Sequence, residues 1–265
     1  MKRWIPFMKS SPTVAVLRLS GVIGTGSRGQ LNDQTLAPLL EKAFRRGKPT
    51  AVALEINSPG GSPVQSSLIA QRIRRLSEEQ NVPVLAFVED VAASGGYWLA
   101  ASADEIFADE NSVVGSIGVI SAGFGAHVFL SRQGLERRVY TAGESKSVLD
   151  PFKPENPDDV KRLQALLEQI HANFIRHVKS RRGSKLSSAP EIFTGQFWAG
   201  QNAEKLGLID GLGHTIPVLK EKFGNDVKLR RYGVRRPVWQ RLGASLMQDA
   251  VAGIEERAEY ARFGL

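Results

Sequence analysis

Two glycine turns in this chain have residue types and spacing that could do chemistry. The first, Ile56-Asn-Ser-Pro-Gly-Gly-Ser62, follows a predicted buried strand and precedes a predicted helix. Its paired glycines, Gly60 and Gly61, let backbone N–H groups face a ligand with no Cβ in the way. Two N–H groups that point outward together can stabilise an oxyanion. An ordinary strand-to-helix turn with a helix cap explains this motif equally well.

The second turn, Ala93-Ser-Gly-Gly96, offers a hydroxyl in an open position. Ser94 lies where a short helix of small residues is predicted to begin, so its neighbours leave it accessible and the helix dipole surrounds it with positive potential. Its oxygen is a candidate nucleophile, and the N–H of Gly95 is a candidate second oxyanion donor. Taken alone, this segment favours a helix-capping serine, because a nucleophilic serine also needs a base.

The usual bases are poorly placed. The four histidines are His127, His171, His177 and His214, and none lies in an H-E-x-x-H motif. His171 and His177 are six residues apart on one predicted helix, and we expect both to be solvated. The chain has no cysteine and no Gly-x-Ser-x-Gly motif. These absences argue against disulfides, thiolate nucleophiles, zinc fingers and Ser-His-Asp hydrolases.

A lysine remains as the candidate base. It must be neutral at the working pH, which requires desolvation or a nearby cation. Lys146, in Gly143-Glu-Ser-Lys-Ser147, is the only lysine between residues 81 and 152 and lies in a predicted loop of small and polar residues. A loop lysine is usually just solvated, so Lys146 gains interest only in combination with Ser94.

The elements that must hold these residues alternate between strand and helix. This spacing predicts right-handed βαβ crossovers and a largely parallel sheet. Ser62 is placed to cap the second helix with Pro63 at its first position, and Pro38 is acceptable because it falls in the first turn of the first helix. The predicted strands are 14–19, 50–56 and 83–88, and the predicted helices are 36–46 and 63–80.

Further along the chain the predicted elements are shorter until a long helix begins. Asn156 can cap this helix, whose apolar residues recur every three or four positions as far as Val178. The predicted strands are 104–108, 113–120 and 136–141, and 143–156 is a loop. The predicted helices are a short one from Ser94, then 124–133, 157–181, one within 193–212, 215–223 and an amphipathic helix over 238–263.

Composition bounds the class of protein and its partners. With 265 residues, 42% hydrophobic and 23% charged, the chain is typical of a soluble globular protein. Basic ends flank a mildly acidic middle, which favours contact with anionic partners such as lipid headgroups. Nucleic acid is another anionic partner, but the sequence contains no nucleic-acid-binding motif that would support it. The uncharged run 111–131 is rich in Gly and Ser, and residues 1–9 lack the apolar core of a signal peptide, so we expect neither a transmembrane anchor nor a signal peptide.

Five segments together resemble the signal peptide peptidase A (protease IV) family of bacterial serine proteases. They occur in the family's order and cover roughly residues 13–223. The resemblance implies an α/β, ClpP/crotonase-like fold of repeated ββα units with a mainly parallel sheet, plus a long helix and a C-terminal amphipathic helix. The segments are Ile56–Ser62, Asp90–Tyr97, Gly115–Val119, Gly143–Ser147 and Phe197–Leu212.

The resemblance also implies an activity and the residues that carry it. The expected activity is that of a serine endopeptidase, without cofactor or metal, that cleaves remnant signal peptides or other apolar or unfolded segments. The Ser–Lys dyad of the family corresponds to Ser94 and Lys146, and Ser116 would orient the lysine. The oxyanion hole would combine Gly60 or Gly61 with Gly95.

The domain plan and the surroundings are also expectations. We predict a basic segment over 1–12, the peptidase domain over 13–223, and a strand with an amphipathic helix over 224–265. Family members usually carry an N-terminal membrane anchor, which we do not find here, so we expect a cytoplasmic protein in peripheral contact with the inner membrane. Single-copy relatives form rings in which adjacent subunits supply the serine and the lysine, so we expect a homo-oligomer with shared sites.

Two other functions fit parts of the sequence. A crotonase-like acyl-CoA enzyme would use the same oxyanion turn and would need catalytic carboxylates, for which Glu89 and Asp90 are the candidates. A catalytically silent scaffold could instead dock on anionic membranes through the basic ends of the chain.

Overall fold

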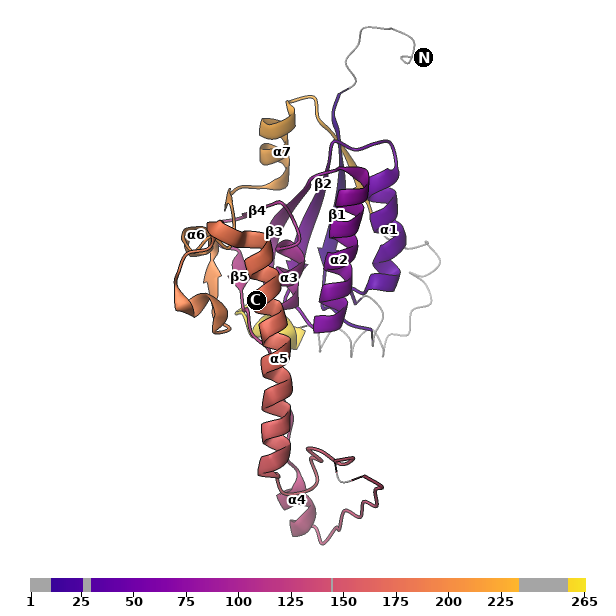
Figure 1. The fold of residues 1–265 in the computed structure, drawn as a ribbon, viewed down its shortest axis with the longest axis vertical. Helices are drawn as coiled ribbons and strands as arrows, with labels where there is room; N and C mark the ends of the chain where they lie inside the picture. Colours follow the sequence, from indigo (N-terminus) through magenta and orange to yellow (C-terminus); the bar gives the residue numbers. More distant parts are fainter. Residues whose placement is uncertain (1–10, 26–29, 144, 234–256) are drawn as a thin grey trace.

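The body of the protein is a mainly parallel sheet with helices on both faces (Figure 1). The computed structural model describes residues 11–25, 30–143, 145–233 and 257–265. The strands are β1 (Thr13–Ser20), β2 (Ala51–Ser58), β3 (Val84–Ala93), β4 (Glu105–Ala108), β5 (Val113–Gly115), β6 (Phe197–Ala199), β7 (Gly211–Leu212) and β8 (Lys228–Tyr232). The helices are α1 (Asp33–Arg45), α2 (Pro63–Gln80), α3 (Gly95–Ala100), α4 (His127–Arg132), α5 (Pro157–Arg182), α6 (Gly200–Lys205) and α7 (Thr215–Phe223), with 3-10 turns η1 (Gly183–Lys185) and η2 (Pro190–Phe193).

The sheet confirms the predicted α/β fold with parallel strands. Its order is β6-β5-β3-β2-β1-β8, with β4 beside β3 and β7 beside β4. Of the pairs between described strands, β5 with β6 alone is antiparallel. Side chains alternate across the sheet: Leu17 faces the core under α1 and α2, whereas Val16 faces the smaller core under α7. The predicted C-terminal strand is β8, which extends this same sheet beside β1.

Helix ends follow the local capping residues. α2 has the predicted bounds, and the Ser62 side chain accepts a hydrogen bond from the N–H of Gln65. α1 begins three residues earlier than predicted, because the Asn32 side chain caps it by accepting from the N–H of Thr35. The expectation that Pro38 lies in the first turn is therefore wrong. Pro38 lies in the second turn of α1 and is exposed, so its ring faces solvent rather than the core.

The predicted strand over 136–141 does not form. These residues have no regular structure, and apart from the half-buried Val139 they are exposed. The strand predicted over 113–120 is also shorter, since β5 ends at Gly115. An alternation of apolar and polar residues becomes a strand only when a neighbouring strand supplies hydrogen bonds, and the segment 136–141 has no such neighbour among the described residues.

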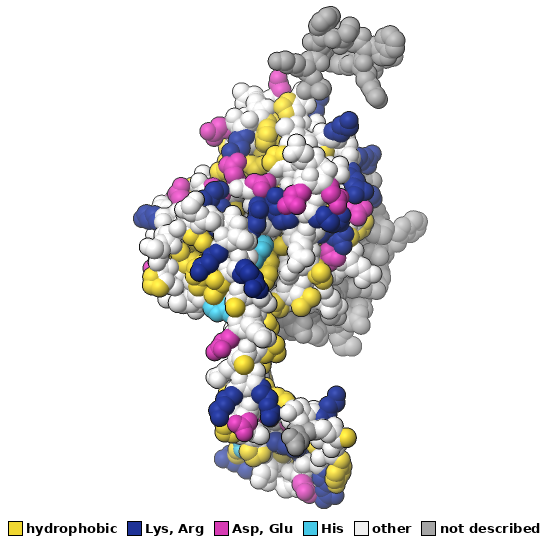
Figure 2. All heavy atoms as spheres, viewed as in Figure 1, with side chains coloured by type: hydrophobic (Ala, Val, Ile, Leu, Met, Phe, Trp, Pro, Cys, Tyr) yellow, Lys and Arg dark blue, Asp and Glu magenta, His cyan; other side chains and the backbone are white. Residues whose placement is uncertain are grey.

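Residues 119–170, which we call the arm, extend away from the body (Figure 1). The arm holds α4, the loop that follows it and the first half of α5. Only the second half of α5 buries apolar side chains against the body, at Phe174 and Val178. The arm exposes large apolar side chains, as the yellow patches on it in Figure 2 show. Phe124 and Tyr140 are 93% and 90% exposed. So much exposed apolar surface is typical of a region that binds a partner.

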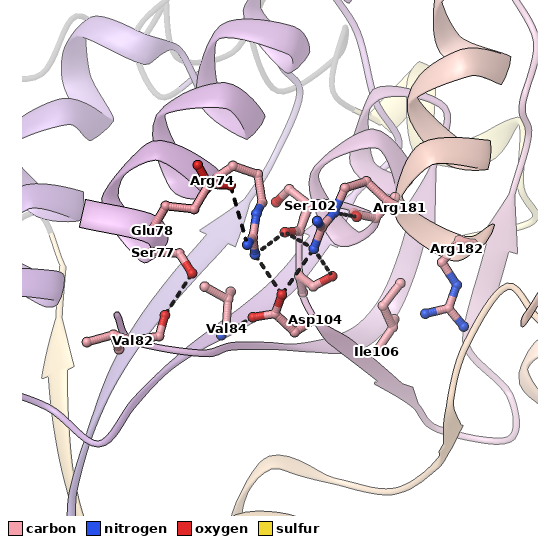
Figure 3. A network of polar contacts seen from close by, with 12 residues as sticks. Arg74, Ser77, Glu78, Val82, Val84, Ser102, Asp104, Ile106, Arg181 and Arg182 are labelled. Carbon is pink, nitrogen blue, oxygen red and sulfur yellow. Dashed lines mark hydrogen bonds and ion pairs between the residues drawn. The ribbon is translucent and has the colours of Figure 1, made fainter. Parts of the chain in front are cut away.

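A polar network fixes the end of α5, and so the direction of the arm, to the body (Figure 3). The guanidinium groups of Arg74 in α2 and Arg181 in α5 both bind Asp104 Oδ1, at 2.8 and 3.1 Å. The next residue, Arg182, is buried and binds Asp210 Oδ2 at 2.6 Å. Breaking the ion pair of a buried arginine is costly, because it leaves an uncompensated charge inside the protein. The pair between Arg182 and Asp210 therefore holds this end of α5 on the body.

His177 is the residue whose surroundings differ most from expectation. We expected it to be solvated, but it is half-buried, its ring stacks on Trp98, and its Nε2 bonds the Trp98 carbonyl at 3.0 Å. Desolvation lowers the pKa of His177 to about 4. His171 is half-buried and bonds the carbonyl of Ile117. Both histidines are therefore structural contacts between α5 and the body.

The depressed pKa of His177 predicts a loss of stability in acid. The His177 imidazole binds a proton near pH 6.5 in the unfolded chain but only near pH 4 in the folded chain. The free energy that neutral His177 contributes to folding is therefore fully present above pH 6.5 and is lost as the pH falls towards 4. Between pH 7 and pH 5 this amounts to about 2 kcal/mol of unfolding free energy. Urea unfolding of the wild type and of His177→Phe at both pH values measures it. An equal pH dependence in the two proteins would show that His177 titrates normally.

The terminal amphipathic helix is described only in part. Residues 238–256 of the predicted helix lie outside the described residues. Residues 257–261 are helical and are followed by a turn to Gly264. Among the described helices, none combines the length and the apolar character needed to cross a bilayer.

Candidate active site

Strand β3 delivers Ser94 to the carboxyl edge of the sheet. The strand runs five residues further than predicted, to Ala93, and α3 begins at Gly95. Ser94 forms the junction with φ 51° and ψ −122°, a conformation that costs energy for any residue with a Cβ. Its N–H donates to the carbonyl of Gly115 in β5 at 2.9 Å, which holds this sharp turn in place. Strained strand-to-helix turns of this type present nucleophiles in hydrolases.

The Ser94 hydroxyl is available for chemistry. Ser94 occupies the N-cap position of α3, yet its side chain makes no capping hydrogen bond. It is partly exposed, and within the described part of the chain Oγ has no hydrogen-bond partner. The capping role that the sequence favoured for this segment alone is therefore not the role of this hydroxyl.

Gly60 packs directly against Ser94. It has φ +107°, and a Cβ built on it would lie 2.8 Å from the Ser94 Cβ and 2.7 Å from the Gly95 nitrogen. Any other residue would be strained and would push the turn apart. The conformation brings the two predicted glycine turns into contact, as the oxyanion hypothesis requires.

The geometry distinguishes between the two glycines. The N–H of Gly60 donates to the buried Ser58 Oγ at 3.2 Å, so it is already used. The N–H groups of Gly61 and Gly95 have no acceptor among the described residues. Sequence reasoning missed the role of Ser58, and its only signal was a small polar residue at the end of a fully buried strand.

Ser116 lies close to Ser94, whereas Lys146 does not. Ser116 follows Gly115, the residue that accepts the Ser94 N–H, and has a positive φ of 53°. The loop between α4 and α5 lies at the far end of α5 from α3 (Figure 1). Lys146 is exposed in this loop, and its amine has no partner in the parts of the chain described. One chain thus brings together the serine, the free N–H groups and Ser116, but it holds the lysine apart from them.

The carboxylates that an acyl-CoA enzyme would need are held by other residues. Glu89 binds the guanidinium of Arg18 at 2.9 Å, and Asp90 accepts from the Asn57 Nδ2 at 2.5 Å. Neither is free to act as a base in this arrangement.

Comparison with known proteins places the chain in a family. The model of peptidase family S49 matches residues 77–225. The chain is 46% identical, over its whole length, to 39% of a Brucella melitensis protein named Na(+)/H(+) antiporter NhaA. It is 31% identical, over 76% of its length, to 32% of protease 4 of Haemophilus influenzae. The chain thus spans about a third to two fifths of the length of these relatives.

A solved structure shares the fold. That of a membrane-bound stomatin-specific protease superposes with a TM-score of 0.54, covering 86% of this chain and all of the other at 17% identity. The family match includes β3, Ser94, Ser116 and Lys146, and it extends through α7. The chain therefore belongs to peptidase family S49, which agrees with the resemblance found in its sequence.

Proposed function

We propose that the protein is a serine endopeptidase with a Ser–Lys dyad formed by Ser94 and Lys146. One observation carries the proposal: the Ser94 hydroxyl lies on a strained turn beside the Gly61 and Gly95 N–H groups, and none of the three has a hydrogen-bond partner among the described residues. A nucleophile next to paired N–H donors is the arrangement that acyl transfer needs. Membership of a peptidase family supports peptide bonds as the substrate.

The reaction follows from these groups. The neutral amine of Lys146 removes the Oγ proton of Ser94 as the oxygen attacks the scissile carbonyl. The N–H groups of Gly61 and Gly95 stabilise the resulting oxyanion, and each donor contributes about 3 kcal/mol. Lys146 then gives the proton to the leaving amine, so the peptide bond breaks and an acyl-enzyme remains. A water molecule, deprotonated by Lys146, hydrolyses the ester, while Ser116 orients the lysine.

A second copy of the chain supplies the lysine in this proposal. The exposed position of Lys146 on the arm supports it, because the amine must leave water to act as a base. The apolar side chains on the same arm support it too, since burial against a neighbour would remove them from solvent. The active particle is then a homo-oligomer in which the arm of one subunit completes the site of the next.

We assign apolar peptides as substrates, such as remnant signal peptides or unfolded segments. Val64 and Leu68 support this assignment. They are 64% and 42% exposed and lie one turn apart on α2, which begins two residues after Gly61. They give the oxyanion turn an apolar border.

The relative named as an antiporter and the basic ends of the chain support action at the cytoplasmic side of the inner membrane, in peripheral contact with anionic lipid.

Labelling with a serine-reactive fluorophosphonate tests the proposal. The assembled protein should be phosphonylated once per chain, with loss of fluoride, and mass spectrometry of the digest should place the label on the peptide that holds Ser94. The Ser94→Ala variant is the control and should take no label. A label on another hydroxyl, or none on a folded oligomer, would contradict the assignment of the nucleophile.

A further inference from the structure

Residues 257–265, which we call the terminal segment, lie across the edge of the sheet that carries Ser94 (Figure 1, yellow). Two side chains of the segment hold it there. The Tyr260 hydroxyl donates to the carbonyl of Asn57, near the end of β2, at 2.8 Å. The Phe263 ring packs edge-on against Phe197 in β6, with ring centroids 5.2 Å apart. The two contacts reach residues that are 203 and 66 positions away in the sequence, and both lie in the body.

The register of the strands places these two contacts on either side of Ser94. Ser58 pairs with Ala92, Ala93 pairs with Gly115, and Gly115 pairs with Phe197. Asn57 and Phe197 therefore lie level with the last residues of β3, and β3 and β5 run between them. Three steps between neighbouring strands span about 14 Å. The N–H of Phe263 bonds the Tyr260 carbonyl, so a single turn separates the two residues. That turn rises only about 5 Å, and the Tyr260 and Phe263 side chains reach the rest of the way to Asn57 and Phe197.

The same edge has unused hydrogen-bonding capacity that a peptide could fill. The Asn57 side chain is 92% buried and its Oδ1 has no partner among the described residues. A buried acceptor without a donor is uncommon in a native protein. The N–H of Gly61, four residues further, is also unused. Phe197 offers an apolar ring that is 45% exposed. The Gly61 donor and the exposed Phe197 ring along one edge suit a peptide with a large apolar side chain.

We propose that the terminal segment occupies, within its own chain, the surface that a substrate peptide crosses to reach Ser94. The side chains of Tyr260 and Phe263 occupy the positions that apolar side chains of a bound substrate would take. Phe197 favours a substrate with an aromatic or large apolar residue at the position that contacts it. The segment must leave before a substrate binds, so it competes with substrate. This inference rests on the proposed function of Ser94.

Kinetics of single substitutions in the full chain test the competition. Tyr260→Phe removes the hydrogen bond and Phe263→Ala removes the ring contact, so both should lower the KM for a fluorogenic peptide with an aromatic residue. A contact of this kind corresponds to a change of about three- to tenfold. The kcat should stay the same, because neither residue takes part in the reaction. Ala261→Ser, at an exposed position of the same segment, is the control and should change neither constant.

A binding measurement separates this inference from the proposed function. In the Ser94→Ala background, a fluorescent synthetic peptide of residues 257–265 should bind the Phe263→Ala protein several-fold more tightly than the protein with an unaltered segment, as measured by anisotropy. The additional Phe197→Ala substitution should weaken that binding. Equal binding to all three proteins, or an unchanged KM in both single variants, would overturn the inference. Because the binding assay needs no catalysis, it tests the terminal segment even if the proposed role of Ser94 is wrong.

Discussion

Replacing Ser94 by alanine should abolish peptide cleavage and leave the fold and the assembly intact. Removing the nucleophile of a hydrolytic site typically lowers kcat by a factor of about 10⁴ or more. Alanine keeps the Cβ and the same positive φ, and the hydroxyl has no partner among the described residues, so the folded chain loses no contact. The measurements are the rate of cleavage of an apolar peptide, thermal unfolding and size-exclusion chromatography.

A matched serine controls for the loss of a hydroxyl. Ser180 is exposed on α5, and its side chain only bonds the carbonyl of His177 one turn earlier. Ser180→Ala should keep wild-type kcat and wild-type elution. Activity within tenfold of the wild type in Ser94→Ala would show that another group attacks the substrate, whatever the family suggests.

The parts of the fold that the sequence predicted correctly are those governed by local interactions. α2 was placed with its true bounds because Ser62 caps it and Pro63 suits its first position. The fully buried β2 was recognised from its continuous run of apolar residues. The glycines at 60 and 61 marked a turn with unusual backbone geometry, and both have positive φ.

Other features depend on contacts distant in sequence and could not be predicted. The strained conformation of Ser94 is set by Gly115 in β5 and by the approach of Gly60, neither of which is adjacent in the chain. The position of the terminal segment depends on Asn57 and Phe197. In each case the deciding partner lies on another element.

The arm shows a different limit, because two of its features lack the partners that they need within the described chain. The segment 136–141 has the pattern of a strand but no neighbour in the described chain to pair with, and Lys146, which corresponds to the catalytic base of the family, lies on the arm apart from Ser94. The second copy of the chain that we propose would explain both mismatches, because it would complete the arm. This explanation predicts an outcome that a single-chain site cannot give.

Two inactive variants should restore activity when they assemble together. Ser94→Ala keeps the lysine and Lys146→Ala keeps the serine, so each homo-oligomer lacks one half of every site. In a mixed ring, a subunit with Lys146→Ala whose neighbour carries Ser94→Ala receives an intact lysine beside its intact serine. Random mixing at equal amounts makes about a quarter of the sites complete, because each site draws independently on two neighbouring subunits.

Co-expression of the two variants with different tags, followed by tandem purification and a peptidase assay, measures this recovery. Pairing Ser94→Ala with the double variant Ser94→Ala/Lys146→Ala is the matched control and should stay inactive, since no subunit then has a serine. If Ser94 and Lys146 of the same chain formed each site, no mixture could recover activity. Mixed oligomers that form but remain inactive would therefore rule out sharing of the dyad, whereas recovery near a quarter would place the base of each site on the neighbouring arm.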